Sequence, residues 1–247
     1  MISVIVPAYN EQHIVEKNTN LIRKKMERIK KNTGNSYEII IVEESSDKTP
    51  EICRELSKKY KEIKHIHSNK RLGKGGAIEK ALGVSHGETV IFMDVDLSTN
   101  LDITEGVLKK MKEYDIVITS RYNPSATVKR SFARSFAGQG FSIMFRLFFR
   151  TKIRDTKCGY KAFRKQLAKK IIKYVGNKGW FWDTEFLIYA ERMGCKICEI
   201  PIEWYERKES NVFIMDNIID MLTNLARLYI KLRLKKYAPK QRTTADF

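Results

Sequence analysis

The chain has 247 residues, of which 43% are hydrophobic, a length sufficient for one substantial core and better matched to one large domain than to two small ones. Its 47 lysines and arginines against 29 acidic residues give a formal charge of +18, so the expected partners are phosphates, nucleic acid or an anionic membrane surface. Four unevenly spaced cysteines exclude a disulfide-framed fold and favour a reducing, cytoplasmic compartment.

The first half of the chain alternates short β-branched runs with longer charged stretches of helical spacing. Strands are expected at 2–6, 38–42, 63–67, 89–93 and 115–119, and helices at 11–31, 49–59, 75–84 and 103–114. This alternation predicts an α/β fold with a parallel sheet. Ligands of such sheets bind beyond the carboxyl ends of the strands, so the segments 7–11, 43–47 and 94–98 are expected to meet at one crevice.

The second half of the chain has a different pattern of apolar and charged residues. The stretch 132–149 is rich in aromatic and aliphatic residues, and predicts either a helix lying in a membrane interface or a core helix. From residue 212 an apolar helical stripe leads into the basic run 231–240. We therefore expect a domain of residues 1–210 and an amphipathic C-terminal helix and tail at 211–247. The tail is expected to dock on a membrane, on a second copy of the chain or on its own domain.

The sequence opens on an apolar strand without a basic leader, and it has no uninterrupted apolar run of about 18 residues. We therefore expect neither secretion nor a membrane-spanning helix. Any membrane contact is expected to be peripheral, at the cytoplasmic face.

Two carboxylates, Asp94 and Asp96, directly follow the apolar strand predicted at 89–93. At that spacing they bring oxygen ligands to Mg²⁺ or Mn²⁺, which in turn holds a diphosphate. Pairs of surface aspartates are common, but two repelling charges at the end of a buried strand are costly unless they bind a cation. The position therefore favours a metal site.

The glycine-rich segment 73–76, which contains Lys74, opens a predicted helix and offers backbone amides and an ammonium to a phosphate. It is not a Walker A loop, because the long spacing to a Lys-Ser or Lys-Thr pair is missing. Taken by itself, a simple glycine turn is the favoured interpretation.

A set of short stretches in one order resembles glycosyltransferase family 2 with the GT-A fold, and most closely its dolichyl-phosphate β-glucosyltransferase and dolichol-phosphate mannose synthase branch. These stretches are IVPAYNE at 5–11, GKGGA at 73–77, FMDVDLS at 92–98, SRY at 120–122, DTKCGYK at 155–161, WDTE at 182–185 and EIPIEW at 199–204. The resemblance implies a Rossmann-like, mostly parallel central sheet flanked by helices.

The resemblance also implies a nucleotide-sugar site. Pro7, Tyr9 and Glu11 would belong to the loop that cups the nucleoside, and Glu43 would contact the base or ribose. The family pattern Val-Asp-Asp-Gly-Ser is replaced here by VEESS at 42–46, with longer carboxylates and no glycine. Base recognition and the identity of the donor therefore stay open.

At the diphosphate, the resemblance implies that Asp94 and Asp96 are the metal and phosphate carboxylates, with Ser98 as a further ligand. Arg207 lies near a family position that reaches the donor diphosphate. Asp183 stands where the family places acidic residues, and is a candidate catalytic residue without an assigned proton transfer.

The acceptor is predicted from the charge of Arg121, Arg130 and Arg134. A phosphate monoester has its second pKa near 6, so its attacking oxygen is ionised at neutral pH and needs a positioning cation rather than a general base. The three arginines adjoin the apolar segment 132–149, where a lipid phosphate would arrive. Surface salt bridges are the alternative interpretation.

The leading hypothesis is inverting transfer of a hexose from UDP-glucose or UDP-N-acetylglucosamine to dolichyl or polyprenyl phosphate, in support of protein or cell-surface glycosylation. Alternatives are GDP-mannose as donor or a hydroxyl as acceptor. A basic nucleic-acid-binding protein would explain the charge but not the carboxylate pair, and the chain lacks a dense aromatic and basic motif. We therefore expect no nucleic-acid partner, and homo-oligomerisation stays open.

Overall fold

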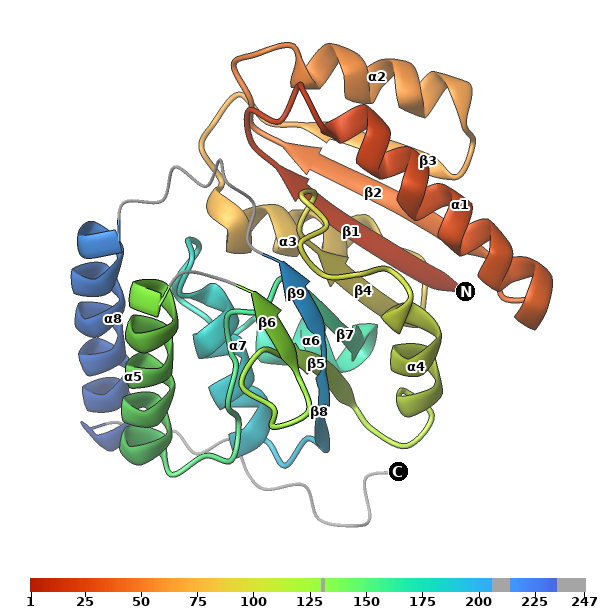
Figure 1. The fold of residues 1–247 in the computed structure, drawn as a ribbon. Coiled ribbons are helices and arrows are strands. Elements are labelled where there is room, and N and C mark those ends of the chain that lie inside the picture. Colours follow the sequence, from red (N-terminus) through yellow and green to blue (C-terminus); the bar gives the residue numbers. More distant parts are fainter. Residues whose placement is uncertain (130–131, 206–213, 235–247) are drawn as a thin grey trace.

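The structure, a computed structural model, describes residues 1–129, 132–205 and 214–234. Its centre is a seven-stranded sheet in the order β3-β2-β1-β4-β7-β5-β8 (Figure 1). The strands are β1 (Ile2–Ala8), β2 (Tyr37–Glu43), β3 (Ile63–His67), β4 (Thr89–Met93), β5 (Ile116–Ser120), β7 (Tyr160–Arg164) and β8 (Ile197–Pro201). All neighbours pair in parallel except β7, which is antiparallel to β4 and β5.

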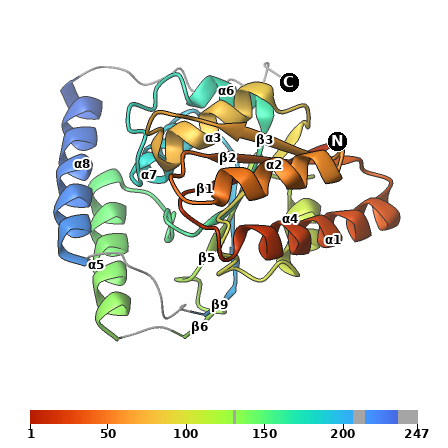
Figure 2. The ribbon, with the colours of Figure 1, turned by 90° about the horizontal axis from the view of Figure 1, so that it is seen from above.

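Helices cover both faces of this sheet. One face carries α1 (Val15–Thr33), α2 (Thr49–Lys59) and α4 (Ile103–Lys110), and the other carries α3 (Gly73–Val84), α6 (Lys165–Ile171) and α7 (Trp182–Arg192). Figure 2 shows the sheet between α3 and α6 on one side and α1 and α4 on the other. Along β1, Val4 and Val6 enter one core and Ile5 the other, as the alternation of side chains in a strand requires.

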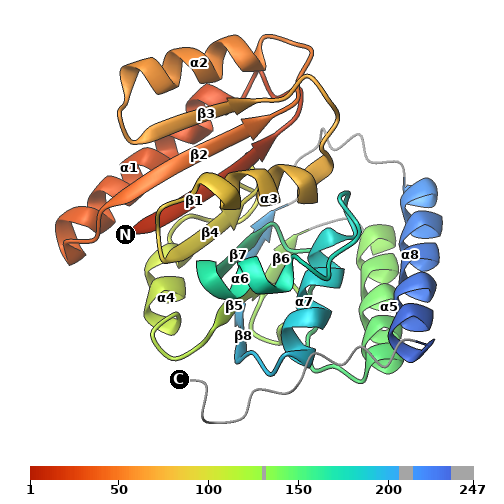
Figure 3. The ribbon, with the colours of Figure 1, turned by 180° about the vertical axis from the view of Figure 1, so that it is seen from behind.

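Two further helices, α5 (Phe132–Phe149) and α8 (Ile214–Leu234), lie side by side beyond α7 (Figures 1 and 3). Phe148 contacts Tyr229 edge to face, with ring centroids 5.2 Å apart. Phe145 of α5 and Leu228 of α8 are buried in the core that also contains α7, whereas Leu147 is 73% exposed. One face of α5 therefore joins the core, as the core-helix interpretation expects, and the other exposes apolar side chains.

A short parallel pair, β6 (Thr127–Lys129) and β9 (Glu203–Tyr205), completes the described elements. The sequence-based expectation of an α/β fold with a mostly parallel sheet is confirmed, with helix boundaries that differ by a few residues. Among the described helices, none combines the length and hydrophobicity needed to cross a bilayer. Most of the basic run 231–240 lies outside the described residues.

Candidate active site

Two adjoining cavities lie at the carboxyl ends of β1 and β4. The first, of about 370 Å³, will be called the donor cavity; it is lined by Pro7, Tyr9, Glu11, Glu44, Arg71, Lys74, Asp94, Asp96 and Trp180, among others. The second, of about 240 Å³, will be called the carboxylate cavity; it shares Asp94, Asp96 and Trp180 with the first and adds Ser98, Arg121, Lys157 and Trp204. The expected meeting of the segments 7–11 and 94–98 is therefore observed.

The carboxylate pair is held in place by its own loop. The backbone N–H of Asp94 donates to the carbonyl of Gly159 at 2.8 Å, which continues the pairing of β4 with β7. Asp96 accepts the Ser98 N–H at 3.0 Å and the Ser98 hydroxyl at 2.6 Å, and Leu97 between them has a left-handed backbone with φ 51°. Ser98, an expected ligand, thus orients the Asp96 carboxylate. Partial burial raises the pKa of Asp94, and the Asp96 and Asp183 carboxylates add to this effect against the Lys74 ammonium.

These residues fit a hard divalent cation. Mg²⁺ and Mn²⁺ bind oxygen, and at phosphate-transfer sites they use one or two carboxylates together with substrate phosphates and water. Asp94 and Asp96 supply two carboxylates to the wall shared by both cavities. No cluster of three or more metal-ligating His, Cys, Asp or Glu side chains occurs among the described residues. The remaining ligands would therefore come from the substrate and from water.

Lys74 connects the glycine-rich segment to this carboxylate pair. Its ammonium lies 3.0 Å from Asp94 Oδ1 and 3.4 Å from Asp183 Oδ2, and these two carboxylates raise the pKa of Lys74 although burial opposes them. The segment needs its glycines: Gly73 has φ 69°, and a Cβ on Gly75 would lie 2.3 Å from the Trp182 ring. It is therefore more than a simple turn, because it brings a buried cation against Asp94.

Asp183 lies at the start of α7, is 1% exposed and lines neither cavity. Its carboxylate is 2.8 Å from the Lys161 ammonium and 3.4 Å from that of Lys74. The two lysines lower the pKa of Asp183 against the opposing effect of burial. Asp183 therefore stays ionised and positions Lys74.

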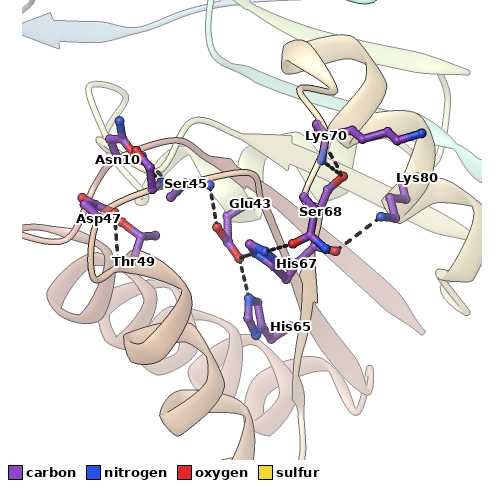
Figure 4. Close-up of polar contacts among 12 residues, drawn as sticks. Asn10, Glu43, Ser45, Asp47, Thr49, His65, His67, Ser68, Lys70 and Lys80 are labelled. Carbon is purple, nitrogen blue, oxygen red and sulfur yellow. Dashed lines mark hydrogen bonds and ion pairs between the residues drawn. The ribbon is translucent and has the colours of Figure 1, made fainter.

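Glu43, expected at the base or ribose, does not reach the donor cavity. It is fully buried, and its carboxylate contacts His67 Nδ1 at 2.6 Å and His65 Nε2 at 3.0 Å and accepts the Ser45 N–H at 2.8 Å (Figure 4). Its neighbour Glu44 lines the cavity instead. In the segment 42–46 it is therefore the second carboxylate that lines the site.

Glu44 and Arg71 were not singled out from the sequence, yet both line the donor cavity. Glu44 accepts the backbone N–H groups of Leu72 and Gly73 and pairs with the Arg71 guanidinium at 3.3 Å. Arg71 in turn lies 3.5 Å above the centre of the Tyr9 ring, a cation–π contact. The sequence signal for Arg71 was its place just before the glycine-rich segment.

Arg121 lines the carboxylate cavity, but its guanidinium is already paired with the Asp155 carboxylate. The Nε–Oδ2 and Nη2–Oδ1 distances are 2.7 and 2.9 Å, and the Arg121 backbone N–H also donates to Asp155 at 3.0 Å. Arg130 and Arg207 lie outside the described residues, and Arg134 belongs to α5, where its side chain is not described. Of the arginines expected at the phosphates, the structure therefore brings Arg121 to the cavities.

Lys157 is a cation that the sequence did not single out. It is half-buried, lines the carboxylate cavity and donates to the Trp180 carbonyl. Burial lowers the pKa of Lys157 to about 7, and the nearby Lys74 and Lys161 ammoniums act in the same direction against the attraction of Asp183. An anion bound in this cavity would relieve both effects.

Comparison with known sequences identifies one family. Residues 3–172 match the family described as Glycosyl transferase family 2. Glycosyltransferase AglD of Haloferax volcanii is 32% identical over 238 residues, which cover 95% of this chain and 38% of AglD. Dolichyl-phosphate beta-glucosyltransferase ALG5A of Trichomonas vaginalis is 33% identical, covering 93% of this chain and 73% of that protein. Dolichyl-phosphate beta-glucosyltransferase of Saccharomyces cerevisiae is 29% identical, with 91% and 72% covered. The chain thus spans well under half the length of AglD.

Comparison with solved structures confirms the fold. Glucosyl-3-phosphoglycerate synthase from Mycobacterium tuberculosis, in complex with Mn²⁺, UDP-glucose and phosphoglyceric acid, aligns with a TM-score of 0.66 at 16% identity, covering 94% of this chain and 79% of that one. Mannosyl-3-phosphoglycerate synthase from Rubrobacter xylanophilus aligns with a TM-score of 0.68 at 16% identity, covering 99% and 78%. At this identity the likeness shows the GT-A fold alone.

Proposed function

The chain belongs to glycosyl transferase family 2, and we propose that it transfers a hexose from a nucleotide diphosphate sugar to dolichyl or polyprenyl phosphate with inversion at the anomeric carbon. UDP-glucose and UDP-N-acetylglucosamine are the proposed donors, and the product would feed protein or cell-surface glycosylation. The observation that carries the proposal is the position of Asp94 and Asp96 on the wall shared by two cavities. The donor cavity is lined by Pro7, Tyr9 and Glu11 of the proposed nucleoside loop. The carboxylate cavity is lined by the cations Arg121 and Lys157.

The donor would occupy the first of these cavities. Pro7, Tyr9 and Glu11 would surround the nucleoside, and Lys74 would approach the diphosphate beside Asp94. Asp94 and Asp96 would hold Mg²⁺ or Mn²⁺, which when bound neutralises the diphosphate and stabilises the leaving group. The complex of a structural neighbour with Mn²⁺ and UDP-glucose supports this assignment.

The acceptor phosphate needs no general base, because its oxygen is already ionised at neutral pH. A hydroxyl acceptor would need one, and Asp183 is ion-paired with Lys74 and Lys161 away from both cavities. This arrangement supports a phosphate acceptor. Two relatives named dolichyl-phosphate beta-glucosyltransferase support the same choice.

We also propose peripheral contact with the cytoplasmic face of a membrane through α5 and α8. Among the side chains of this helix pair that the structure describes, the large apolar ones that are exposed are Ile143, Leu147, Phe148, Ile219, Leu222 and Ile230. Basic residues accompany them, which suits an anionic lipid surface. Residues 235–247 are proposed to add charge to this contact.

The direct test is to incubate the protein with a panel of UDP- and GDP-sugars, Mg²⁺ or Mn²⁺, and polyprenyl phosphate, and to identify glycolipids by mass spectrometry. The proposal expects a UDP-hexose to give a hexosyl phosphoprenyl product that requires the metal. Transfer to hydroxyl acceptors with none to polyprenyl phosphate would contradict the acceptor assignment. Sole use of GDP-mannose would contradict the donor assignment.

A further inference from the structure

We propose that Lys157 binds the acceptor phosphate, and that the carbon atoms next to this phosphate lie in a small apolar cavity between Arg121 and the helices α5 and α8. This inference rests on the proposed function and deepens it, because it names the cation and the wall that recognise a prenyl phosphate. Two independent observations carry it.

The first observation is the charge balance around Asp183. Lys74 and Lys161 are both within ion-pairing distance of Asp183, at 3.4 and 2.8 Å. No carboxylate of the described residues lies within ion-pairing distance of Lys157, whose ammonium donates to the Trp180 carbonyl. A half-buried cation without a carboxylate partner is unfavourable in the free protein. Its charge is therefore available to an incoming anion.

Arg121 differs from Lys157 in this respect. Both line the carboxylate cavity, but the Arg121 fork is matched by Asp155 in a bidentate pair. The Arg121–Asp155 pair is close to neutral as a unit, so it contributes shape more than charge. Lys157 thus supplies positive charge that no carboxylate of the described residues matches, in the carboxylate cavity and not in the donor cavity.

The second observation is a small cavity of about 60 Å³ that adjoins the carboxylate cavity. Arg121 and Lys157 line both cavities, so they lie at the junction. Beyond them the small cavity is lined by Phe141 and Phe145 of α5 and Met221 of α8. A ligand that spans the junction meets an ammonium at one end and apolar side chains at the other. This is the pattern of a phosphorylated hydrocarbon.

The size of the small cavity limits what enters it. It holds a few carbon atoms, so the rest of a prenyl chain would continue outside it. Ser142, Arg154, Asp155 and Thr156 also line the small cavity, but a hydroxyl or carboxyl group placed against Phe141 and Phe145 would be left unpaired. The apolar part of the lining therefore favours a hydrocarbon next to the phosphate.

The reaction at this junction balances without a proton. An ionised oxygen of the acceptor phosphate forms the new bond to the anomeric carbon of the hexose. The bond from that carbon to the donor diphosphate breaks, and its electron pair leaves with the nucleoside diphosphate. Lys157 takes no proton from the acceptor and acts by holding the attacking phosphate.

The charge is tested with Lys157→Gln, which keeps an N–H donor for the Trp180 carbonyl and removes the ammonium. The acceptor KM for polyprenyl phosphate is expected to rise about tenfold or more. The donor affinity by calorimetry is expected to stay within about twofold, because Lys157 does not line the donor cavity. Lys152→Met, an exposed lysine five positions away, is the matched control and is expected to behave as wild type.

The wall is tested with Met221→Trp, which fills the small cavity, against Leu21→Trp at an exposed position of α1 that lines none of the three cavities. Met221→Trp is expected to raise the KM for polyprenyl and farnesyl phosphate and to leave inhibition by inorganic phosphate unchanged. Lys157→Gln is expected to weaken inhibition by inorganic phosphate as well. This pattern of effects would distinguish recognition of the prenyl chain, by the wall, from recognition of the phosphate, by Lys157.

Unchanged acceptor KM in Lys157→Gln, with an active wild type, would overturn the assignment of Lys157. Equal behaviour of the two tryptophan variants would overturn the assignment of the wall. A purely structural role for Lys157 predicts instead a lower melting temperature and equal losses of donor and acceptor binding, and that result would also overturn the proposal. Failure of the wild type to use any prenyl phosphate would contradict the proposed function itself. If Lys157→Gln fails to fold, Lys157→Met gives the same comparison.

Discussion

Glu43 and Glu44 are adjacent in the chain but have opposite environments at the end of β2. The Glu43 carboxylate is buried against His65 and His67, whereas Glu44 lines the donor cavity and accepts the N–H of Gly73 at 3.1 Å. Neighbouring side chains of an extended strand point to opposite faces, so one of the two serves the core and the other the site.

We therefore expect different effects from neutralising these two residues. Glu44→Ala should weaken binding of the nucleotide sugar about tenfold, because Arg71 and the start of α3 lose their carboxylate. Glu43→Gln should lower the free energy of unfolding by about 1–3 kcal/mol, because the fully buried Glu43 carboxylate loses its charge-assisted hydrogen bonds. Calorimetry and urea denaturation measure the two effects. Wild-type donor affinity in Glu44→Ala would contradict the role of this residue.

The contact between Glu43 and His67 predicts a pH dependence of stability. The hydrogen bond to Glu43 raises the pKa of His67 above its ordinary value of 6.5. Such a group stabilises the fold below its unfolded pKa, and this contribution is lost as the pH rises through the higher folded pKa. We expect the stability of wild type relative to His67→Gln to decline as the pH rises from about 6 to about 8. Urea denaturation across that range measures the difference, and a constant difference would contradict the expectation.

Local patterns predicted the sheet and the carboxylate pair. The β-branched runs placed β1, β2, β3, β4 and β5, and the end of β4 placed Asp94 and Asp96. Contacts between residues far apart in the sequence could not be predicted from these local patterns. Asp155 lies 34 residues from Arg121, and the segment that leads into the antiparallel β7 brings Lys157 to the site from a distant part of the chain. Which of Glu43 and Glu44 faces the cavity depends on where β2 ends, and strand ends are poorly marked by periodicity.

Removal of the metal is expected to abolish activity with little effect on the fold. Asp94 and Asp96 without a cation repel the donor diphosphate, so turnover should fall at least about a hundredfold in excess EDTA and return with Mn²⁺ or Mg²⁺. Asp96→Ala should have a similar effect with an unchanged melting temperature, since Asp96 lies in a loop after β4. Full turnover of metal-stripped protein would contradict the metal assignment.

Substitution of Arg121 is expected to affect the fold before it affects the acceptor. Arg121→Ala leaves the buried Asp155 without its guanidinium, a change that costs about 3–5 kcal/mol of stability. Arg130→Ala and Arg134→Ala should raise the acceptor KM about tenfold, because the sequence predicts that these arginines hold the acceptor phosphate. Denaturation curves and glycolipid formation measure the two effects. An Arg121→Ala protein as stable as wild type would contradict this account.

Gly159→Ala tests the geometry of the metal site without substituting either of its carboxylates. A Cβ at Gly159 would lie 1.9 Å from Asp94 Oδ2, and its backbone φ is not positive, so the Cβ acts by displacing Asp94. We expect metal-dependent binding of the nucleotide sugar to weaken about tenfold or more. Gly106→Ala in α4 is the control, because a Cβ there meets nothing within 4 Å and should stabilise the helix by about 0.5–1 kcal/mol. Calorimetric titrations with and without Mn²⁺ measure the effect. If both alanine variants bind donor with the metal dependence of wild type, the Asp94 carboxylate does not need its observed position, and the metal site must be assigned to other ligands.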